Sequence, residues 1–568
     1  MSGSFTSEIP FGNENLPADH MGEMVNQSVA EHGSKPAFSC VLPSGHAQTL
    51  SYNEIGHYSD AVAVFLRKEL GLKRGDVVAI QSPNTLAYPV LAFGVFKAGL
   101  IVTNVNPLYT PKETNHQLKD SGAKVWFVID IFGDRIEASI SGTDVERVYK
   151  VSLLDFFPAV QRKALSFAMK YIKKIVPPFQ GECAGTVASV IKSGEKLLRE
   201  GAVVADFSAD LGLDDVALFQ YTGGTTGRSK GALLTHGNVV SNIAQTNLRD
   251  EGGNWVDDDA MILVLPLYHV YALAVGALNS MVRGCHVVLV PAPRPLKNLK
   301  PVFSNFDISI MPGVNTLYQG LMREDWFVSS PPEKLRLCFS GAAPLQPATA
   351  DAWFELTGNV IYEGYGLTEG TCVVATMPFD RPPKRGTCGL PVPGTEVRIV
   401  GDNGEDLPTG EAGELWLRGP QIMKGYLNDP VGSEASLTDG WLRTGDVAVL
   451  DSEGYLSIVD RIKDMVIVSG FNVYPTDIED VLTRFADVAE AAVIGVPDIE
   501  TGERVVAYVV AADAALSAEE VVRYCREHLT SYKVPKTVHI VQELPKSPVG
   551  KILRRELRDK ASEFSGAL

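Results

Sequence analysis

A glycine- and threonine-rich stretch with one lysine offers the clearest chemistry in this sequence. Residues 221–231 read YTGGTTGRSKG, where glycines let a backbone approach a polyphosphate and hydroxyls and amides donate to its oxygens. This is not a Walker A loop, because Arg228 and Ser229 separate Gly227 from Lys230. A surface loop or glycine hairpin is the alternative, but it gives no reason for the threonines and the lysine. The stretch therefore predicts a phosphate-binding loop, with these candidate contacts: Thr222, Gly223, Gly224, Thr225, Thr226, Gly227 and Lys230.

Three shorter strings add carboxylates and a second lysine. Residues 364–369 read GYGLTE, residues 444–446 read TGD and residues 548–551 read PVGK. Magnesium favours one or two carboxylates together with substrate phosphates, which suits Glu369. A carboxylate is also a suitable bidentate acceptor for a diol, which suits Asp446. Each string alone has an ordinary explanation as a helix start, a turn or a solvated charge, but together with a phosphate loop they favour a nucleotide site.

These strings, in this order, resemble the signature of the adenylate-forming superfamily of acyl-CoA synthetases, adenylation domains and luciferases, which usually carries proline where Ser229 stands. The resemblance covers most of the chain. Three longer strings resemble bacterial long-chain fatty acyl-CoA ligases: LPLYHVYAL at 265–273, VSGFNVYPTDIEDVL at 468–482 and LPKSPVGKILRRELRD at 544–559. The resemblance implies that ATP and Mg²⁺ convert a medium- or long-chain fatty acid into an acyl-adenylate. The acyl group then passes to CoA, with AMP and pyrophosphate as the other products.

The resemblance also implies roles for individual residues. Lys551 would be the catalytic lysine that reaches the α-phosphate and the carboxylate, and Glu369 would hold Mg²⁺. His269 matches a position near the carboxylate, and a neutral histidine packed against Tyr268 is the alternative. The remaining nucleotide contacts that the resemblance implies are Tyr365 beside the adenine, Gly366, Thr368 at a phosphate, Asp446 at the ribose hydroxyls, and Arg461.

For transfer to CoA, the resemblance implies a second set of residues. Gly470 and Phe471 belong to a loop that enters the active site after the C-terminal domain rotates, and Lys463 matches the hinge. Leu273 stands where some long-chain relatives carry a tryptophan gate, which argues against a gated acyl tunnel. The candidate acyl pocket consists of Val314, Gly341, Ala342 and Leu273. Its small residues would leave a deep apolar channel, although tight packing explains them equally well.

Alternating strand-like and helix-like runs must position these residues. Such alternation predicts α/β layers with mostly parallel strands through the first two thirds of the chain. Strands are expected at 76–81, 123–129, 261–265, 286–290 and 309–312, and a helix at 87–97. From about residue 386 to 459, turn dipeptides separate short strand-like pieces, which predicts a β-rich subdomain.

A further α/β unit follows the β-rich region. Its expected elements are helices at 478–485 and 518–529 and strands at 488–496 and 505–511. The charged string DRIKD at 460–464 is the predicted domain boundary. Residues 1–460 would then form the N-terminal AMP-binding domain, with the β-rich subdomain at 386–460. Residues 461–568 would form a small α+β C-terminal domain, which the resemblance implies is mobile.

Length and composition exclude several classes of protein. A chain of 568 residues is too long for one ordinary core, and its net charge of −17 argues against general nucleic-acid binding. Seven cysteines without CxxC pairing suit a reducing cytosol, and the N-terminus has no secretory signal. Residues 261–282 carry no formal charge, but Pro266 and other polar residues interrupt them. A strand, a turn and a buried helix at about 270–281 are expected there rather than a membrane span.

Residues 161–176, QRKALSFAMKYIKKIV, carry five cations and no acid. As a helix, they would place Leu165, Met169, Ile172 and Val176 on one face. Such a helix could lie on an anionic bilayer, which would place the protein at the inner face of the cell membrane. An ordinary surface helix is the alternative, and both remain open, as does a homodimer. Two other functions also remain open: an acyl-AMP ligase that loads a carrier protein, and a non-catalytic, membrane-associated fatty-acid binder.

Overall fold

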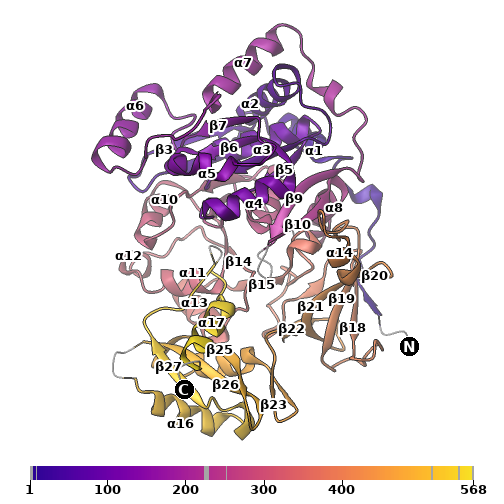
Figure 1. Cartoon of the computed structure of the whole chain (residues 1–568), viewed down its shortest axis with the longest axis vertical. Coiled ribbons are helices and arrows are strands. Elements are labelled where there is room, and N and C mark those ends of the chain that lie inside the picture. The colour runs from indigo at the N-terminus through magenta and orange to yellow at the C-terminus, as the bar shows by residue number, and fades with distance from the viewer. Residues whose placement is uncertain are drawn as a thin grey trace.

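Four β-sheets organise the part of the chain that is described (Figure 1). The computed structural model describes residues 4–7, 9–222, 229–250, 253–512, 516–547 and 550–565. Five of the predicted phosphate contacts lie outside these ranges: Gly223, Gly224, Thr225, Thr226 and Gly227.

The first large sheet has seven strands and lies in the upper part of Figure 1. Its strands, in order across the sheet, are β10 (Lys230–Thr235), β9 (Val216–Thr222), β5 (Ile101–Asn104), β4 (Val77–Gln81), β6 (Ala123–Ile129), β7 (Arg147–Val151) and β8 (Gly185–Thr186). All neighbouring strands are parallel except β10 and β9. Strand β4 is buried at every position, as expected for a parallel strand covered on both faces.

The second large sheet has nine strands. Its strands, in order, are β17 (Leu390–Pro391), β16 (Ala375–Thr376), β15 (Ile361–Tyr365), β14 (Leu337–Ser340), β13 (Ile310–Gly313), β11 (Ala260–Leu263), β12 (His286–Leu289), β2 (Pro36–Val41) and β3 (Ala47–Ser51). The six strands from β15 to β2 are parallel. These two sheets confirm the predicted α/β class and its mostly parallel strands.

One hydrophobic core joins the two large sheets around helix α3 (Ala87–Lys97), every residue of which is buried. Lys97 is tolerated there because its ammonium group lies 2.7 Å from the Asp60 carboxylate. Helices α1 (Met21–His32) and α2 (Tyr52–Val64) belong to the same core, and α7 (Val187–Arg199) packs on α2. A second core covers the opposite face of the seven-stranded sheet with α4 (Pro111–Ser121) and α5 (Ile136–Ile140).

Local capping defines several helix starts. Helix α4 begins after Thr110, whose hydroxyl accepts from the Glu113 N–H, and it ends at Gly122 in the left-handed region with φ of 62°. Helix α8 (His236–Arg249) has the same arrangement, with Thr235 accepting from the Asn238 N–H at 3.0 Å. Both helices thus start at the polar residue that the sequence supplies.

The uncharged stretch at 261–282 folds as predicted. Strand β11 is followed by a turn, the π-helix η6 (Ala272–Leu278) and α9 (Asn279–Arg283). Within the described ranges, no helix is long and apolar enough to cross a membrane. Other helices of this half are α10 (Lys300–Asn305), α11 (Asn315–Leu321), α12 (Asp325–Val328) and α13 (Pro347–Thr357).

The predicted β-rich region forms a six-stranded antiparallel sheet, which also includes a strand from the N-terminus. Its members are β1 (Ser4–Thr6), β18 (Glu396–Val400), β19 (Gly413–Arg418), β21 (Trp441–Leu450) and β20 (Leu437–Thr438), with β22 (Leu456–Arg461) paired to β21. Helix α14 (Pro430–Ser436) precedes β20.

The C-terminal part has its own sheet and its own cores. The sheet contains β24 (Phe471–Val473), β23 (Val466–Val468), β26 (Gly502–Ala511), β25 (Val488–Asp498) and β27 (Thr537–Val541). Its helices are α15 (Pro475–Thr483), α16 (Ala518–His528) and α17 (Arg554–Ser565). Ile458 still packs on the main core, whereas Val466 begins the next one. The core therefore changes across the charged string at 460–464, and the boundary at residue 460 stays a prediction.

The basic stretch at 161–176 is helical only as far as Ile172. It forms α6 (Ala159–Phe167) and the π-helix η4 (Ala168–Ile172), which project at the upper left of Figure 1. The predicted apolar face is partly wrong. Leu165 and Met169 pack against the main core, but the side chain of Ile172 is exposed, because the helix ends there.

Candidate active site

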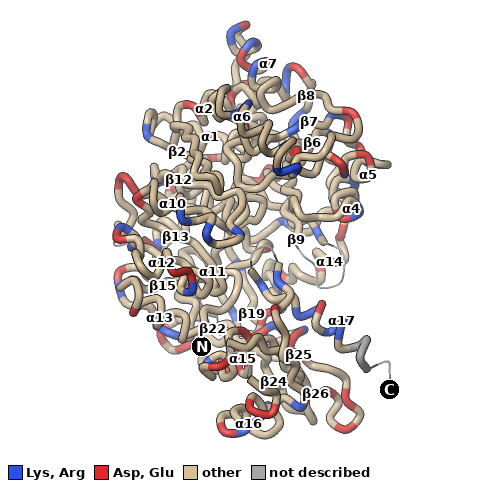
Figure 2. Tube along the Cα trace, turned by 90° about the vertical axis from the view of Figure 1, so that its left-hand side faces the viewer, with Lys and Arg blue, Asp and Glu red and all other residues tan. Residues whose placement is uncertain are grey.

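A cleft of about 2420 Å³ separates the large sheets from the C-terminal part. Its walls include Tyr365 and Asp446 from the larger part, and Lys551 and Arg554 from the C-terminal part. Figure 2 shows the lysine and arginine residues along α17, whose first residues line the cleft. The cleft therefore has one wall from the larger part of the chain and one from the C-terminal part.

Tyr365, Asp446 and Arg461 form a hydrogen-bonded set in this cleft. Tyr365 ends strand β15, and its hydroxyl donates to Asp446 Oδ2 at 2.5 Å. Asp446 and Arg461 face each other on the paired strands β21 and β22, with 3.1 Å between Arg461 Nε and Asp446 Oδ1. Burial and the Asp446 charge raise the pKa of Tyr365 well above its usual range, so the phenol keeps its proton. A carboxylate has about four lone-pair positions, so Asp446 can still accept from a diol.

Lys551 enters the same cleft from the C-terminal part. Its backbone N–H donates to Ser547 Oγ at 3.1 Å, and Gly550 before it has a positive φ of 77°. Burial lowers the pKa of Lys551 to about 8, with a further contribution from the Arg461 cation. Burial and Arg461 also lower the pKa of Lys463 to about 8. The structure thus brings together the predicted lysine, the predicted hinge residue and the predicted ribose contact.

His269 lies close enough to Lys551 for its titration to be affected. Burial lowers the pKa of His269 to about 4, and the Lys551 charge is the second cause. The Tyr271 N–H donates to His269 Nδ1 at 3.3 Å, which assigns the proton of the neutral ring to Nε2. His269 is therefore a neutral histidine, as one explanation from the sequence expected. It also lines the cleft, as a residue near the substrate would.

Glu369 and Lys230 line the cleft beside the predicted phosphate loop. Tyr426 donates its hydroxyl proton to Glu369 Oε1 at 2.7 Å, and Lys230 Nζ lies 5.1 Å from the Tyr426 ring centroid. Lys230 also forms an ion pair with Asp429 at 2.8 Å. Thr222, Gly366 and Thr368 line this region as well.

The residues on this side fit a magnesium ion whose binding also requires the phosphates of the substrate. Among the described residues, no group of three or more His, Cys, Asp or Glu side chains could hold a metal ion. Glu369 lines the cleft, and the hydrogen bond from Tyr426 occupies only its Oε1. Mg²⁺ commonly takes one or two carboxylates and completes its shell with phosphates and water. One carboxylate in a cleft open to a nucleotide suits that ion.

Glycine is required in the GYGLTE string. A Cβ atom on Gly366 would lie 1.5 Å from the Cys372 carbonyl oxygen, closer than any side chain allows. Ala342, in the predicted acyl pocket, has a positive φ of 65°, which is uncommon for a residue with a side chain. The backbone is therefore constrained at both positions.

The structure divides the predicted acyl pocket. Gly341 and Ala342 line the cleft, and a Cβ on Gly341 would lie 3.3 Å from the Tyr271 ring. Val314 and Leu273 are instead buried in the main core. Val314 lies against the turn that precedes Lys551, because a Cβ on Gly550 would lie 3.1 Å from its methyl group.

Gly470 and Phe471 lie away from the cleft. They occupy the turn and first residue of the β23–β24 hairpin, and Phe471 is exposed, with its ring stacked 4.7 Å from that of Tyr532. Neither residue contributes to the cleft wall. The C-terminal part therefore presents Lys551 to the cleft and keeps the predicted thioester residues elsewhere.

Comparison with known proteins identifies the family. The AMP-binding enzyme family matches residues 25–427, and the AMP-binding enzyme C-terminal domain matches residues 477–551. The chain belongs to the AMP-binding enzyme family. A long-chain-fatty-acid–CoA ligase from Yersinia pestis is 42% identical over 538 residues, which cover 95% of this chain and 94% of the relative. A protein of the same name from Bacillus subtilis is 33% identical, covering 98% and 96%.

Solved structures of AMP-binding enzymes share this fold. ATP-bound MatB from Rhodopseudomonas palustris has a TM-score of 0.81 and 29% identity, covering 96% of this chain and 99% of that one. The anthranilate CoA ligase AuaEII in complex with anthranoyl-AMP has a TM-score of 0.83 and 25% identity, covering 98% and 100%.

Sequence reasoning missed several residues of this AMP-binding enzyme. Tyr426, the hydrogen-bond partner of Glu369, is 57 positions away in the sequence, and no spacing pattern connects the two. Tyr271, Asn279 and Trp255 line the cleft as well. Tyr271 lies inside the string at 265–273 that carried the resemblance, so helical spacing from it could have indicated Asn279.

Proposed function

We propose that this AMP-binding enzyme is a long-chain fatty acid–CoA ligase. It converts a medium- or long-chain fatty acid and ATP to acyl-AMP and pyrophosphate, and then converts acyl-AMP and CoA to acyl-CoA and AMP. The observation that carries the proposal is the placement of Lys551, which the C-terminal part holds opposite Tyr365 and Asp446. The relatives named as long-chain-fatty-acid–CoA ligases support the choice of substrate.

In the first half-reaction, the fatty carboxylate attacks the α-phosphorus of ATP and pyrophosphate leaves. Negative charge gathers on phosphoryl oxygens, so the residues act by positioning and by charge. Asp446 accepts from the ribose hydroxyls, and the Lys551 ammonium group stabilises charge at the α-phosphate. Glu369 would hold Mg²⁺, which when bound neutralises charge on phosphate oxygens. Neutral His269 offers its Nε2–H near the carboxylate.

In the second half-reaction, the CoA thiol attacks the acyl-AMP carbonyl and AMP leaves. We assign this step to a second orientation of the C-terminal domain, in which the Gly470 turn replaces Lys551 at the cleft. The predicted hinge is tied to the C-terminal part in the present orientation, since Arg558 donates to Asp464 at 2.7 Å. Arg554 also lies 3.6 Å from Asp464. During a rotation about residues 461–464, the contacts of Arg558 and Arg554 with Asp464 would move together with the C-terminal domain.

Two assays separate this proposal from its alternatives. Purified protein with hexadecanoic acid should exchange labelled pyrophosphate into ATP, and AMP release should require CoA. A requirement for a pantetheinylated carrier protein instead of CoA would indicate the carrier-loading ligase. Binding of hexadecanoic acid without any exchange would indicate the non-catalytic binder.

The lowered pKa of Lys551 predicts a pH dependence of adenylate formation. With a pKa of about 8 instead of 10.5, the amine loses its positive charge as pH rises through 8. The kcat/KM for pyrophosphate release should therefore fall above pH 8. Lys463 has a similar pKa, so two variants identify the group. Lys551→Arg should remove the fall, because arginine stays charged, whereas Lys463→Arg should keep it. A flat wild-type profile from pH 7 to 10 would contradict the assignment.

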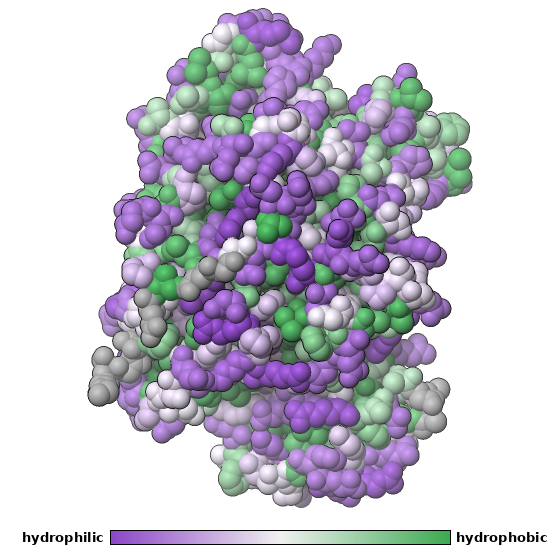
Figure 3. Space-filling model, turned by 180° about the vertical axis from the view of Figure 1, so that it is seen from behind, coloured by the Kyte–Doolittle hydropathy of each residue, from purple (hydrophilic) through white to green (hydrophobic). Residues whose placement is uncertain are grey.

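We also propose that the α6 segment, defined as residues 159–176, contacts an anionic bilayer. Five of the sixteen exposed large hydrophobic side chains in the described chain lie here: Val160, Phe167, Tyr171, Ile172 and Ile175. Ile172 is 70% exposed, although Leu165 and Met169 anchor the segment to the body. Figure 3 shows hydrophobic residues on this lobe at the upper right. Its five cations and lack of acids contrast with a chain of net charge −17.

Vesicle binding tests this contact. The protein should co-sediment with vesicles that contain phosphatidylglycerol, and less so at high salt. Each Lys→Gln change at Lys170, Lys173 or Lys174 should weaken partitioning about fivefold, because a cation near an anionic surface contributes ~1 kcal/mol. Lys192→Gln and Lys196→Gln on α7 are matched controls. Concentration-dependent dimerisation that Phe167→Ser abolishes, without vesicle binding, would instead assign this face to a homodimer.

A further inference from the structure

Tyr426 contacts two of the charged side chains that line the cleft. Its hydroxyl donates to Glu369 Oε1 at 2.7 Å, and Lys230 Nζ lies over its ring, 5.1 Å from the centroid. The three residues come from distant parts of the chain. Glu369 belongs to the short 3-10 helix η8 (Thr368–Gly370), Lys230 begins β10, and Tyr426 lies in the segment that precedes α14. One side chain therefore joins the predicted metal ligand to the predicted phosphate-binding lysine.

The backbone around Tyr426 is fixed against strand β10. Residues 424–427 exchange backbone hydrogen bonds of 2.8–2.9 Å with residues 231–233 of that strand. Just before them, the Met423 N–H donates to the Glu369 carbonyl oxygen at 2.8 Å. The segment is thus bonded both to β10 and to the backbone of Glu369. The Tyr426 hydroxyl can therefore hold the Glu369 carboxylate in one orientation.

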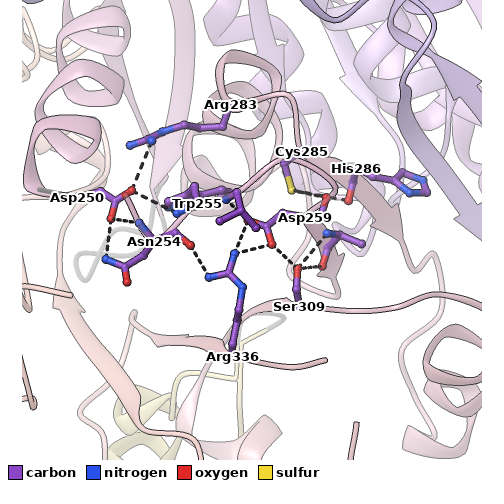
Figure 4. Close-up of polar contacts among 11 residues, drawn as sticks. Asp250, Asn254, Trp255, Asp259, Arg283, Cys285, His286, Ser309 and Arg336 are labelled. Atoms are coloured by element: carbon purple, nitrogen blue, oxygen red, sulfur yellow. Dashed lines mark hydrogen bonds and ion pairs between the residues drawn. The ribbon is translucent and has the colours of Figure 1, made fainter. Parts of the chain in front are cut away.

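Glu369 keeps one carboxylate oxygen for a ligand. In the described part of the chain, its side chain accepts a hydrogen bond only at Oε1. The Asp259 carboxylate shows the opposite case (Figure 4), because Arg336 donates to both of its oxygens at 2.6 Å and the Ser309 hydroxyl donates to Oδ1 at 2.7 Å. Asp259 is 2% exposed and lies outside the cleft wall. Glu369 is half-buried and lines the cleft, so its Oε2 is available to a cation.

Lys230 has a partner that a nucleotide can replace. Its ion pair with Asp429 joins side chains that are 36% and 32% exposed, and such exposed pairs contribute little to stability. Asp429 also accepts from the Gly432 N–H at 2.8 Å, so its carboxylate keeps a partner when the ammonium group leaves. The Lys230 ammonium group can thus exchange this carboxylate for a phosphate oxygen while the Tyr426 ring stays beside it.

We propose that Tyr426 is a positioning residue for Mg²⁺ and ATP: its hydroxyl orients Glu369 for the metal ion, and its ring holds Lys230 for the phosphates. This inference rests on the proposed ligase function and adds a residue to the nucleotide-binding part of the same site. Loss of a hydrogen-bond partner of a ligating carboxylate typically lowers metal affinity by roughly 10–100-fold. The attraction between a cation and an aromatic face is weaker. One side chain should therefore have two separable effects.

Binding of ATP in the absence of fatty acid tests the inference without any turnover. Calorimetry gives the dissociation constant in excess Mg²⁺ and again in EDTA. Tyr426→Phe keeps the ring, so it should weaken binding in Mg²⁺ about tenfold and leave the value in EDTA unchanged. Tyr426→Leu also removes the ring and should weaken binding in EDTA about threefold. Glu369→Gln is the reference for a lost metal ligand. Tyr58→Phe is a matched control, because Tyr58 lies on α2 outside the cleft wall.

The outcomes distinguish this inference from the proposed function. Equal affinity of wild type and Tyr426→Phe in Mg²⁺ would overturn the role of the hydroxyl, with the ligase function intact. Equal weakening in Mg²⁺ and in EDTA would also overturn it, because the hydroxyl would then support the whole cleft rather than the metal site. Wild-type affinity in EDTA for Tyr426→Leu would overturn the role of the ring. No binding of ATP by wild type in either condition would instead contradict the ligase function. Calorimetry reports the number of sites separately from the dissociation constant, so partial unfolding of a variant does not imitate the expected result.

Discussion

Replacing Lys551 with alanine is expected to lower the rate of acyl-AMP formation by about 10²–10³-fold. Removing one preorganised hydrogen-bond donor that faces developing negative charge on oxygen typically lowers the rate by this factor. Lys551 lies half-buried in the cleft near Arg461 and Asp446, where water screens its charge less than at the surface. Single-turnover pyrophosphate release with hexadecanoic acid measures the loss directly.

The same variant should still make acyl-CoA when it is given synthetic acyl-AMP, within a few fold of the wild-type rate. The proposed second orientation removes Lys551 from the cleft, so thioester formation does not depend on this side chain. Lys560→Ala is a matched control, because Lys560 lies exposed on α17 and is not part of the cleft wall. An equal loss in both half-reactions would mean that Lys551 supports the fold or the closed domain arrangement rather than adenylate formation.

The sequence predicts those parts of the site that are local in the chain. Tyr365, Asp446 and Lys551 each lie in a short string whose residue types fit their chemistry. Asp446 and Arg461 face each other only because a register shift between Val447 and Ala448 offsets the pairing that starts at the turn between β21 and β22, and the strings themselves do not show this shift. The strands of the large sheets could be predicted from their apolar runs, because hydrophobic periodicity is a local property of the sequence.

The remaining features depend on packing between distant segments. Only the fold brings the Tyr426 hydroxyl to Glu369. Leu273 belongs to a matching string, yet it faces the core, while Val275, two residues later, faces the cleft. The π-helical turn of η6 changes which residues share a face of the helix. A match between sequence strings does not show which face a residue lies on. Likewise, composition alone could not show that Leu165 packs inward while Ile172 is exposed.

Replacing Gly470 with leucine is expected to have the opposite effect to Lys551→Ala. Thioester formation from supplied acyl-AMP should fall about 10²-fold, because a side chain on this turn would displace the CoA thiol, and misplacement of about 1 Å can reduce a rate that much. Acyl-AMP formation should change little. In the present orientation Gly470 lies outside the cleft, and apart from its two chain neighbours no residue of the described chain comes within 4 Å of where its Cβ would be.

Backbone strain is the competing explanation, since Gly470 has a positive φ of 84°. Gly470→Asn separates the two effects, because asparagine adopts this conformation more readily than leucine but still adds bulk. Blocked thiol access predicts that Asn and Leu both impair thioester formation, whereas strain predicts that Asn is nearly harmless. Equal damage to both half-reactions by Gly470→Leu would contradict the assignment of this turn to the second orientation. The two orientations would then have to be replaced by one arrangement that serves both steps.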